Sequence, residues 1–173
     1  MPNLQLRPVA VHALQIPGSD PWHARPGDPA MTVMTDFREH SSITVADSDC
    51  IDAALEHMKH TGVRCAFAVD RERRAVIGMI TAYDIGGDKP LRLMQSINAR
   101  RGEVLVRDLM QPIRDWRVLH VEDLERCTVA AVNLLFETSG LTHIPVMERN
   151  LQGEARLRGL LSSAKIKRLL SPG

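Results

Sequence analysis

The chain of 173 residues contains an internal repeat. Residues 78–85 are Gly-Met-Ile-Thr-Ala-Tyr-Asp-Ile, and residues 159–166 are Gly-Leu-Leu-Ser-Ser-Ala-Lys-Ile. In both copies an apolar strand ends at a hydroxyl residue and turns into a helix. Another apolar strand precedes each copy, at residues 65–70 and 143–148. A repeat of this length indicates one structural unit used twice, whose copies need each other to bury their apolar faces.

Composition places the chain among globular proteins, with 44% apolar residues and a length that suits one compact unit or two small halves. A net charge of +1 and an aromatic content of 3% argue against a nucleic-acid partner. Cys50, Cys65 and Cys127 are scattered, which predicts reduced thiols and a cytoplasmic location. The first 22 residues have no signal-like apolar core, and no apolar run reaches about 18 residues, so neither secretion nor a membrane partner is expected.

The first copy predicts the element order β-α-β-β-α. A strand at residues 43–45 is followed by Asp-Ser-Asp at 47–49, which offers N-cap chemistry for a helix. Strands at 63–69 and 76–81 come next, and a short helix opens at 83–85. Helical spacing predicts that the apolar face of the first helix consists of Ile51, Ala54, Leu55 and Met58.

The second copy predicts the same order, with strands at 117–121, 141–148 and 157–162 and a closing helix at 164–170. A connecting helix at 90–100 is expected to turn Leu91, Met94 and Ile97 inward. The inward face of the helix in the second copy is predicted to be Cys127, Ala130, Ala131, Leu134 and Thr138. Its outward face would then carry Val129, Val132 and Phe136, which suggests burial in a homodimer.

These patterns divide the chain into four segments. Residues 1–30 form a proline-rich N-terminal arm, in which residues 4–16 have the pattern of an edge strand or of an arm on a neighbouring surface. The first unit spans 31–88, a connecting helix and linker span 89–104, and the second unit spans 105–173.

The element order and the repeated Gly-apolar-apolar-hydroxyl strand end resemble the CBS domain, and a tandem pair of them resembles a Bateman module. The resemblance covers residues 31–170, and Val-Met-Thr at 33–35 and Asp-Leu-Met at 108–110 are similar to the short motifs that precede each CBS unit. It implies an α/β (α+β) fold of two β-α-β-β-α CBS units packed with pseudo-two-fold symmetry.

Thr81 and Asp84 are the strongest candidates for a site. A hydroxyl and a carboxylate three residues apart, where a strand turns into a helix, can exchange hydrogen bonds with the cis hydroxyls of a ribose. The resemblance implies that role, with the base in an apolar cleft between the units and basic groups on the phosphates. The positions that match the phosphate-facing strand starts are Arg64, Cys65, Thr142 and His143, and the candidates for the base pocket are Val63 and Ile43. Two alternatives stay open: Asp84 as a simple helix cap, and Arg64 as a solvated residue.

The second copy departs from the pattern. Ser162 keeps the hydroxyl, but Lys165 replaces the carboxylate and cannot accept a hydrogen bond from ribose. This second, degenerate site is expected to be empty or specialised, for example with the ammonium near a phosphate.

The sequence contains no nucleophile–base pair, P-loop or dinucleotide glycine fingerprint, so an enzyme is not expected. His57 and His60 lack a third ligand, so neither a metal site nor a catalytic cofactor is expected. The leading hypothesis is a regulatory module that binds an adenine nucleotide such as AMP, ADP or ATP, forms a homodimer and acts on an effector protein. The alternative is a structural CBS pair that dimerises or docks a partner without a ligand.

Overall fold

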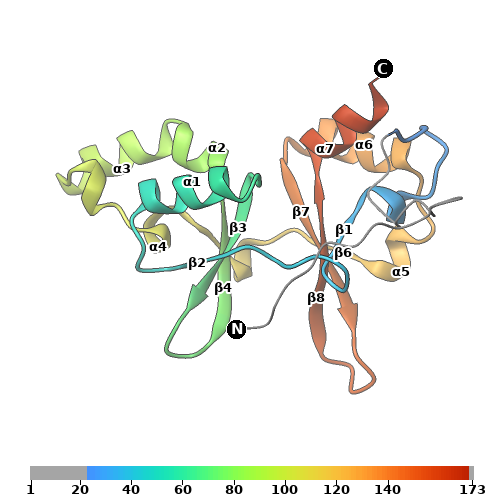
Figure 1. The fold of residues 1–173 in the computed structure, drawn as a ribbon, viewed down its shortest axis with the longest axis horizontal. Helices are drawn as coiled ribbons and strands as arrows, with labels where there is room; N and C mark the ends of the chain where they lie inside the picture. The colour runs from blue at the N-terminus through green and yellow to red at the C-terminus, as the bar shows by residue number, and fades with distance from the viewer. Residues whose placement is uncertain (1–22, 172–173) are drawn as a thin grey trace, which may run out of the picture.

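The computed structural model describes residues 23–171, which form two four-stranded sheets with helices packed against them (Figure 1). The first sheet has the order β2-β3-β4-β5, and the second has the order β1-β8-β7-β6. The first sheet comprises β2 (Thr44–Ala46), β3 (Cys65–Asp70), β4 (Ala75–Thr81) and β5 (Gln111–Pro112). The second comprises β1 (Thr35–Asp36), β6 (Leu119–His120), β7 (His143–Arg149) and β8 (Ala155–Ser162).

Helices α1–α3 and α6–α7 lie together at one side of the molecule, and the turns of the β3–β4 and β7–β8 hairpins project at the other (Figure 1). The helices are α1 (Ile51–His60), α2 (Ala82–Gly86), α3 (Lys89–Ile97), α4 (Val106–Leu109), α5 (Val121–Leu124), α6 (Val129–Ser139) and α7 (Ser163–Leu170). Short 3-10 helices are Ala30–Val33, Arg101–Glu103 and Ile113–Asp115. No helix within residues 23–171 is long and apolar enough to cross a membrane.

The predicted α/β fold of two repeated units is confirmed. In each unit a parallel pair (β2–β3, β6–β7) is followed by an antiparallel hairpin (β3–β4, β7–β8), with a helix between the first two strands and another after the hairpin. We call the β2-β3-β4-β5 sheet with α1–α4 the first unit, and the β1-β8-β7-β6 sheet with α5–α7 the second unit. The short helix α5 is an addition that the sequence did not predict.

The two units exchange the segments that precede them. Residues 30–36, the first lead-in segment, precede the first unit in the chain, yet β1 pairs with β8 of the second unit. Residues 104–112, the second lead-in segment, place β5 beside β4 of the first unit. Each segment also fills the core that it joins: Val33 is buried in the core of the second unit, and Val106 in the core of the first. The boundaries at 31–88 and 105–173 follow the chain, whereas the packing divides it differently.

A glycine permits each exchange. Gly159 in β8 lies opposite Asp36, and a Cβ added there would come within 2.6 Å of the carbonyl oxygen of Thr35 and 2.6 Å of Met34 Sδ. Gly78 in β4 lies opposite Pro112, and a Cβ there would come within 2.7 Å of the carbonyl oxygen of Gln111. The repeated glycine therefore gives room for the crossing strand from the other half of the chain.

Ion pairs and aromatic rings join the halves further. Arg158 of β8 is buried and binds the carboxylates of Asp36 in β1 and Glu148 in β7. Between the sheets, Phe67 of β3 meets the ring of Phe37 edge-on at 5.6 Å between ring centroids. It also meets the ring of Trp116 at 5.8 Å. These contacts make the two units one body.

Helix α1 packs largely as predicted but begins differently. Ile51, Ala54 and Met58 are buried. Its N-cap is Cys50, which makes no side-chain capping bond, so the expectation that residues 47–49 would cap it is wrong. The Asp49 carboxylate accepts a hydrogen bond from the backbone N–H of Ala46 at 2.9 Å instead, because this acidic run forms a turn before the helix.

Helix α6 faces the opposite way from the prediction. Its buried residues are Val129, Val132 and Phe136, while Ala130, Ala131, Leu134 and Thr138 are exposed. Both faces are apolar, and the face with the larger side chains is the one in the core, since it removes more area from water. The argument for a homodimer from outward-facing Val129, Val132 and Phe136 is therefore wrong, although the small-residue face with Leu134 is left exposed.

Helix α3 also differs, because Leu91 and Ile97 are exposed and only Pro90 is fully buried. Leu93 and Met94 contact the core of the first unit. The predicted strand at 117–121 is shorter, since α5 begins at Val121. The strand or arm expected at residues 4–16 lies outside the described residues.

Candidate functional site

Two cavities lie between the units, and each is lined from both of them. The first, which we call the Asp84 cavity, has a volume of about 550 Å³. From the first unit it is lined by Met79, Thr81, Tyr83, Asp84, Lys89, Leu109, Met110, Gln111 and Pro112, with Asp115 next to them, and from the second by Gly140, Leu141, Thr142 and His143. Thr81 and Asp84 reach it from the junction of β4 and α2, and Thr142 and His143 reach it from the start of β7 in the other unit.

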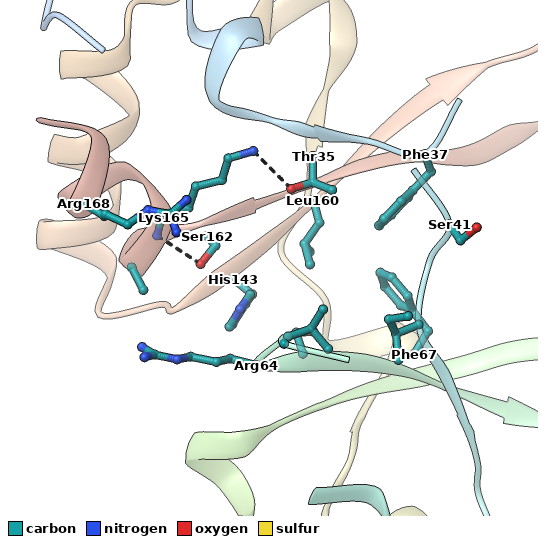
Figure 2. Close-up of a pocket in the computed structure, with 15 residues that line it drawn as sticks. Thr35, Phe37, Ser41, Arg64, Phe67, His143, Leu160, Ser162, Lys165 and Arg168 are labelled. Atoms are coloured by element: carbon teal, nitrogen blue, oxygen red, sulfur yellow. Dashed lines mark hydrogen bonds between the residues drawn. The ribbon is translucent and has the colours of Figure 1, made fainter. Parts of the chain in front are cut away.

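The second, which we call the Lys165 cavity, has a volume of about 450 Å³ (Figure 2). It is lined by Thr35, Phe37, Ser41, Ile43, Gly62, Val63, Arg64, Cys65 and Phe67, and by His143, Leu160, Ser162, Ala164, Lys165 and Arg168. Figure 2 shows Arg64, Lys165 and Arg168 toward one end of this cavity and Phe37 and Phe67 toward the other. The cavity is thus cationic at one end and aromatic at the other.

The structure divides the predicted site residues between these cavities. Thr81 and Asp84 meet Thr142 and His143 in the Asp84 cavity. Ile43, Val63, Arg64 and Cys65 instead line the Lys165 cavity, together with Ser162 and Lys165. His143 lines both. The strand end of each unit thus faces the strand start of the other unit, because the units pack about their pseudo-two-fold axis.

Thr81 and Asp84 form a capping box at the start of α2. The Asp84 N–H donates to Thr81 Oγ1 at 3.1 Å, and Asp84 Oδ2 accepts from the Thr81 N–H at 3.0 Å. Asp84 Oδ2 also accepts from Thr81 Oγ1 at 2.6 Å. The alternative that Asp84 caps the helix is therefore seen directly, and this cap uses one of its two carboxylate oxygens.

Asp84 Oδ1 is engaged by Lys89. The Lys89 ammonium, at the start of α3, pairs with this oxygen. The Asp84 side chain is 18% exposed, whereas that of Lys89 is 62% exposed. The carboxylate is thus held at the cavity wall with its lysine partner on the solvent side.

His143, at the start of β7, separates the cavities. Burial lowers the pKa of His143 to about 4; the Asp84 charge opposes this shift and the Arg64 charge adds to it. The ring is therefore neutral near pH 7, and its Nδ1 lies 3.1 Å from Thr142 Oγ1. A neutral imidazole can exchange hydrogen bonds with a ligand but does not supply a cation for a phosphate.

Arg64 and Tyr83 link the two cavities. The Arg64 guanidinium donates to the Tyr83 hydroxyl at 3.0 Å, and the Tyr83 and His143 ring centroids are 6.5 Å apart. Arg64 lines the Lys165 cavity and Tyr83 the Asp84 cavity. Burial, with the Asp84 charge as a smaller cause, raises the pKa of the neighbouring Cys65 to about 12, which keeps this thiol protonated.

The degenerate repeat keeps the cap but reverses the charge. Ser162 Oγ accepts a hydrogen bond from the Lys165 N–H at 3.5 Å, as the N-cap of α7. The Lys165 ammonium donates to Thr35 Oγ1 at 3.4 Å, which ties it to the first lead-in segment (Figure 2). With Arg64 and Arg168 it gives the Lys165 cavity three cations, and no carboxylate is among its lining residues within 23–171.

The lining residues that sequence reasoning did not assign to a site include Lys89, Tyr83 and Arg168. Tyr83 and Lys89 flank Asp84 in the sequence, so proximity to the motif was a usable signal. Arg168 lies three residues after Lys165 on the same face of α7, which helical spacing could have shown. Within the described part of the chain, no group of three or more His, Cys, Asp or Glu side chains is arranged to hold a metal ion.

Comparison with solved structures shows the fold. The CBS-pair protein CBSX2 from Arabidopsis thaliana superposes with a TM-score of 0.52 at 21% identity, over 82% of this chain and 93% of that one. The structure of the same protein in complex with AMP superposes with a TM-score of 0.52 at 20% identity, over 82% of this chain and 95% of that one. The CBS-domain containing protein ATU1752 from Agrobacterium tumefaciens superposes with a TM-score of 0.53 at 17% identity, over 76% of this chain and 91% of that one.

No protein-family model matches the sequence, and a search of curated proteins finds no match. The likeness therefore lies in the fold, which is that of a tandem pair of CBS domains.

Proposed function

We propose that this protein is a non-catalytic regulatory module that binds an adenine nucleotide between its two CBS units. The observation that carries the proposal is the Asp84 cavity, which places a carboxylate and a hydroxyl beside an ammonium and against an apolar wall. Met79, Met110, Pro112 and Leu141 belong to that wall. Its volume of about 550 Å³ falls in the range of small-molecule sites, about 300–1,000 Å³.

Each part of a nucleotide has a counterpart in this cavity. The apolar wall suits a base, and Thr81 with Asp84 suits the cis hydroxyls of a ribose. Thr142 and His143 supply neutral hydrogen-bonding groups from the second unit. The complex of CBSX2 with AMP supports the ligand class, since that protein shares this fold.

The position of the cavity between the units supports a regulatory role. Thr81 and Asp84 belong to the first unit, and Thr142 and His143 to the second. A ligand that contacts both favours the arrangement of the units that brings these groups together. An effector protein that contacts both units would sense that arrangement.

The Lys165 cavity favours an anion by a different chemistry. Arg64, Lys165 and Arg168 surround its cationic end, and Phe37 and Phe67 its aromatic end. We expect it to accept the phosphate end of a ligand without the ribose–carboxylate contact, because Lys165 stands where the first repeat has Asp84.

A second candidate function is a structural pair that dimerises or docks a partner without a ligand. The capping box favours it, because Thr81 and Asp84 already have a role in starting α2. Exposed apolar residues on α3 and α6, which include Leu91, Ile97 and Leu134, also offer contact area for a second copy. We therefore propose a homodimer under either function.

A thermal-shift panel of AMP, ADP, ATP, NAD and S-adenosylmethionine separates these candidates. A ligand at 100 times its Kd stabilises the native state by about 2.7 kcal/mol, which raises the melting temperature. The nucleotide proposal expects at least one adenine nucleotide to raise it in the wild type and less in Asp84→Asn. No shift with any of the five compounds would refute it and leave the structural pair.

A further inference from the structure

Lys89 occupies the carboxylate oxygen that a ribose would need. Asp84 Oδ2 is used by the Thr81 N–H and hydroxyl, at 3.0 and 2.6 Å. Asp84 Oδ1 is paired with the Lys89 ammonium. Three of the roughly four acceptor sites of the carboxylate are therefore used, so the two cis hydroxyls of a ribose together need one site that a partner now holds.

The lysine is the partner that gives way more easily. The capping bonds hold the backbone at the start of α2, so their loss would disturb the helix itself. Lys89 is 62% exposed, and its ammonium can exchange a carboxylate for water or another anion without moving the fold. Exposed ion pairs of this kind change an equilibrium by only about two- to fivefold.

Lys89 also stands out among the groups around the cavity. The ionisable side chains that line it within the described residues are Tyr83, Asp84, Lys89, Asp115 and His143. His143 is neutral near pH 7, because burial lowers its pKa to about 4. Arg64 lines the other cavity and donates to Tyr83. Lys89 is thus the lining group of the Asp84 cavity, within residues 23–171, that brings a positive charge to a phosphate.

We propose that Lys89 is a specificity-determining residue of the Asp84 cavity, which pairs with Asp84 as seen in this structure and moves to the ligand phosphate when a nucleotide binds. This inference rests on the proposed nucleotide function. A phosphorylated ligand gives the displaced ammonium a new anion, whereas an unphosphorylated nucleoside displaces it without compensation. Lys89 therefore makes the cavity select nucleotides against nucleosides.

The test compares adenosine and AMP binding to the wild type and to Lys89→Met. Removal of the ammonium frees Asp84 Oδ1, so adenosine should bind about two- to fivefold more tightly. AMP loses a charge-assisted contact to its phosphate, so it should bind about tenfold more weakly. The preference for AMP over adenosine should therefore fall by more than tenfold.

Arg92→Met is the matched control. Arg92 lies on the same helix, is 81% exposed and pairs with Asp88, and it does not line the cavity. The Arg92→Met substitution removes one positive charge from the helix that carries Lys89 but leaves Asp84 paired with Lys89. Its preference for AMP over adenosine should stay within about twofold of that of the wild type, since exposed charges act weakly at a distance.

Salt dependence provides a second readout. Adenosine is uncharged, so its binding should depend on salt only through the pair that it must break. Because salt screens the exposed pair of Lys89 and Asp84, adenosine should bind the wild type more tightly at 500 mM than at 50 mM salt. The same change of salt should have no effect on Lys89→Met.

The ligand can be located by NMR, because Tyr83 is the single tyrosine of the chain and lines this cavity. Ring-signal shifts that both ligands cause in the wild type and that weaken in Asp84→Asn support the assignment. Binding that leaves the ring signals unmoved places the ligand elsewhere and overturns it. If AMP binds but Lys89→Met changes both affinities equally, or neither, the inference alone is wrong. If AMP fails to bind the wild type, the proposed function is wrong, and the inference falls with it.

Discussion

Gly159→Ala is predicted to destabilise the protein by loosening the exchanged strand β1. An added Cβ would come within 2.6 Å of the Thr35 carbonyl oxygen and of Met34 Sδ. The methionine side chain can move, but the carbonyl belongs to the backbone of β1, so the strand must shift away from β8. Overpacking of this kind costs about 1–3 kcal/mol, and the backbone contact favours the upper half of that range.

Urea denaturation of Gly159→Ala beside Gly102→Ala measures this cost. A Cβ at Gly102 would meet no atom within 4 Å, so alanine there should leave stability unchanged or slightly raised. Gly78→Ala should resemble Gly159→Ala, since its Cβ would come within 2.7 Å of the Gln111 carbonyl oxygen. If Gly159→Ala is as stable as Gly102→Ala, the backbone of β1 does not lie as close to Gly159 as described.

Three further predictions concern stability and assembly. The hydrogen bond with Arg158 holds the pKa of Asp36 below its ordinary value, so Asp36 stabilises the fold above its unfolded pKa and loses this contribution as the pH falls through its folded pKa. The free energy of unfolding should therefore fall less steeply with decreasing pH in Asp36→Asn than in the wild type. Equal slopes of the two proteins would count against the Asp36–Arg158 pair. A fragment of residues 30–88 should aggregate or fold poorly, since it lacks Val104 and Val106, which are buried in its core; a cooperative, monomeric melt would contradict this. Sedimentation at tens of micromolar should show a dimer, and a 19.3 kDa monomer would refute that proposal.

The sequence predicted the fold because the repeat carries strong local signals. Helix α1 and the two hairpins carry apolar patterns of their own, and Gly62 and Gly140 follow helices with a positive φ, as expected at such positions. The exchange of lead-in segments was not predicted, because β1 and β5 have two residues each and no periodicity of their own. The signal available was a glycine at the same place in both hairpins, which marks a close backbone approach.

Helix α6 shows where periodicity fails. Both of its faces are apolar, so the pattern alone does not choose between them. The volumes of Val132 and Phe136 against those of Ala130 and Ala131 would have favoured the observed face.

The candidate site was predicted by residue type but not by grouping. Thr81 and Asp84 were grouped with both Arg64 and His143 by their positions in the family, yet the units pack so that Asp84 shares a cavity with His143 while Arg64 lines the other cavity. Which residues share a cavity depends on how the two units pack together. Contacts between distant parts of the chain determine this packing, and local sequence patterns do not predict them. Lys89 was missed because a lysine at the start of a helix is ordinarily solvated.

Calorimetric titration of AMP into the wild type, Asp84→Asn and Lys165→Ala tests the central claim most directly. Asp84→Asn keeps the size of the side chain but removes the charge that strengthens hydrogen bonds from ribose hydroxyls, which is about 1.5–3 kcal/mol for a charged group. AMP affinity should therefore fall about ten- to a hundredfold in Asp84→Asn. In Lys165→Ala, by contrast, it should change far less and in a way that weakens as salt rises. Undiminished binding of AMP to Asp84→Asn would contradict a ribose site at Asp84.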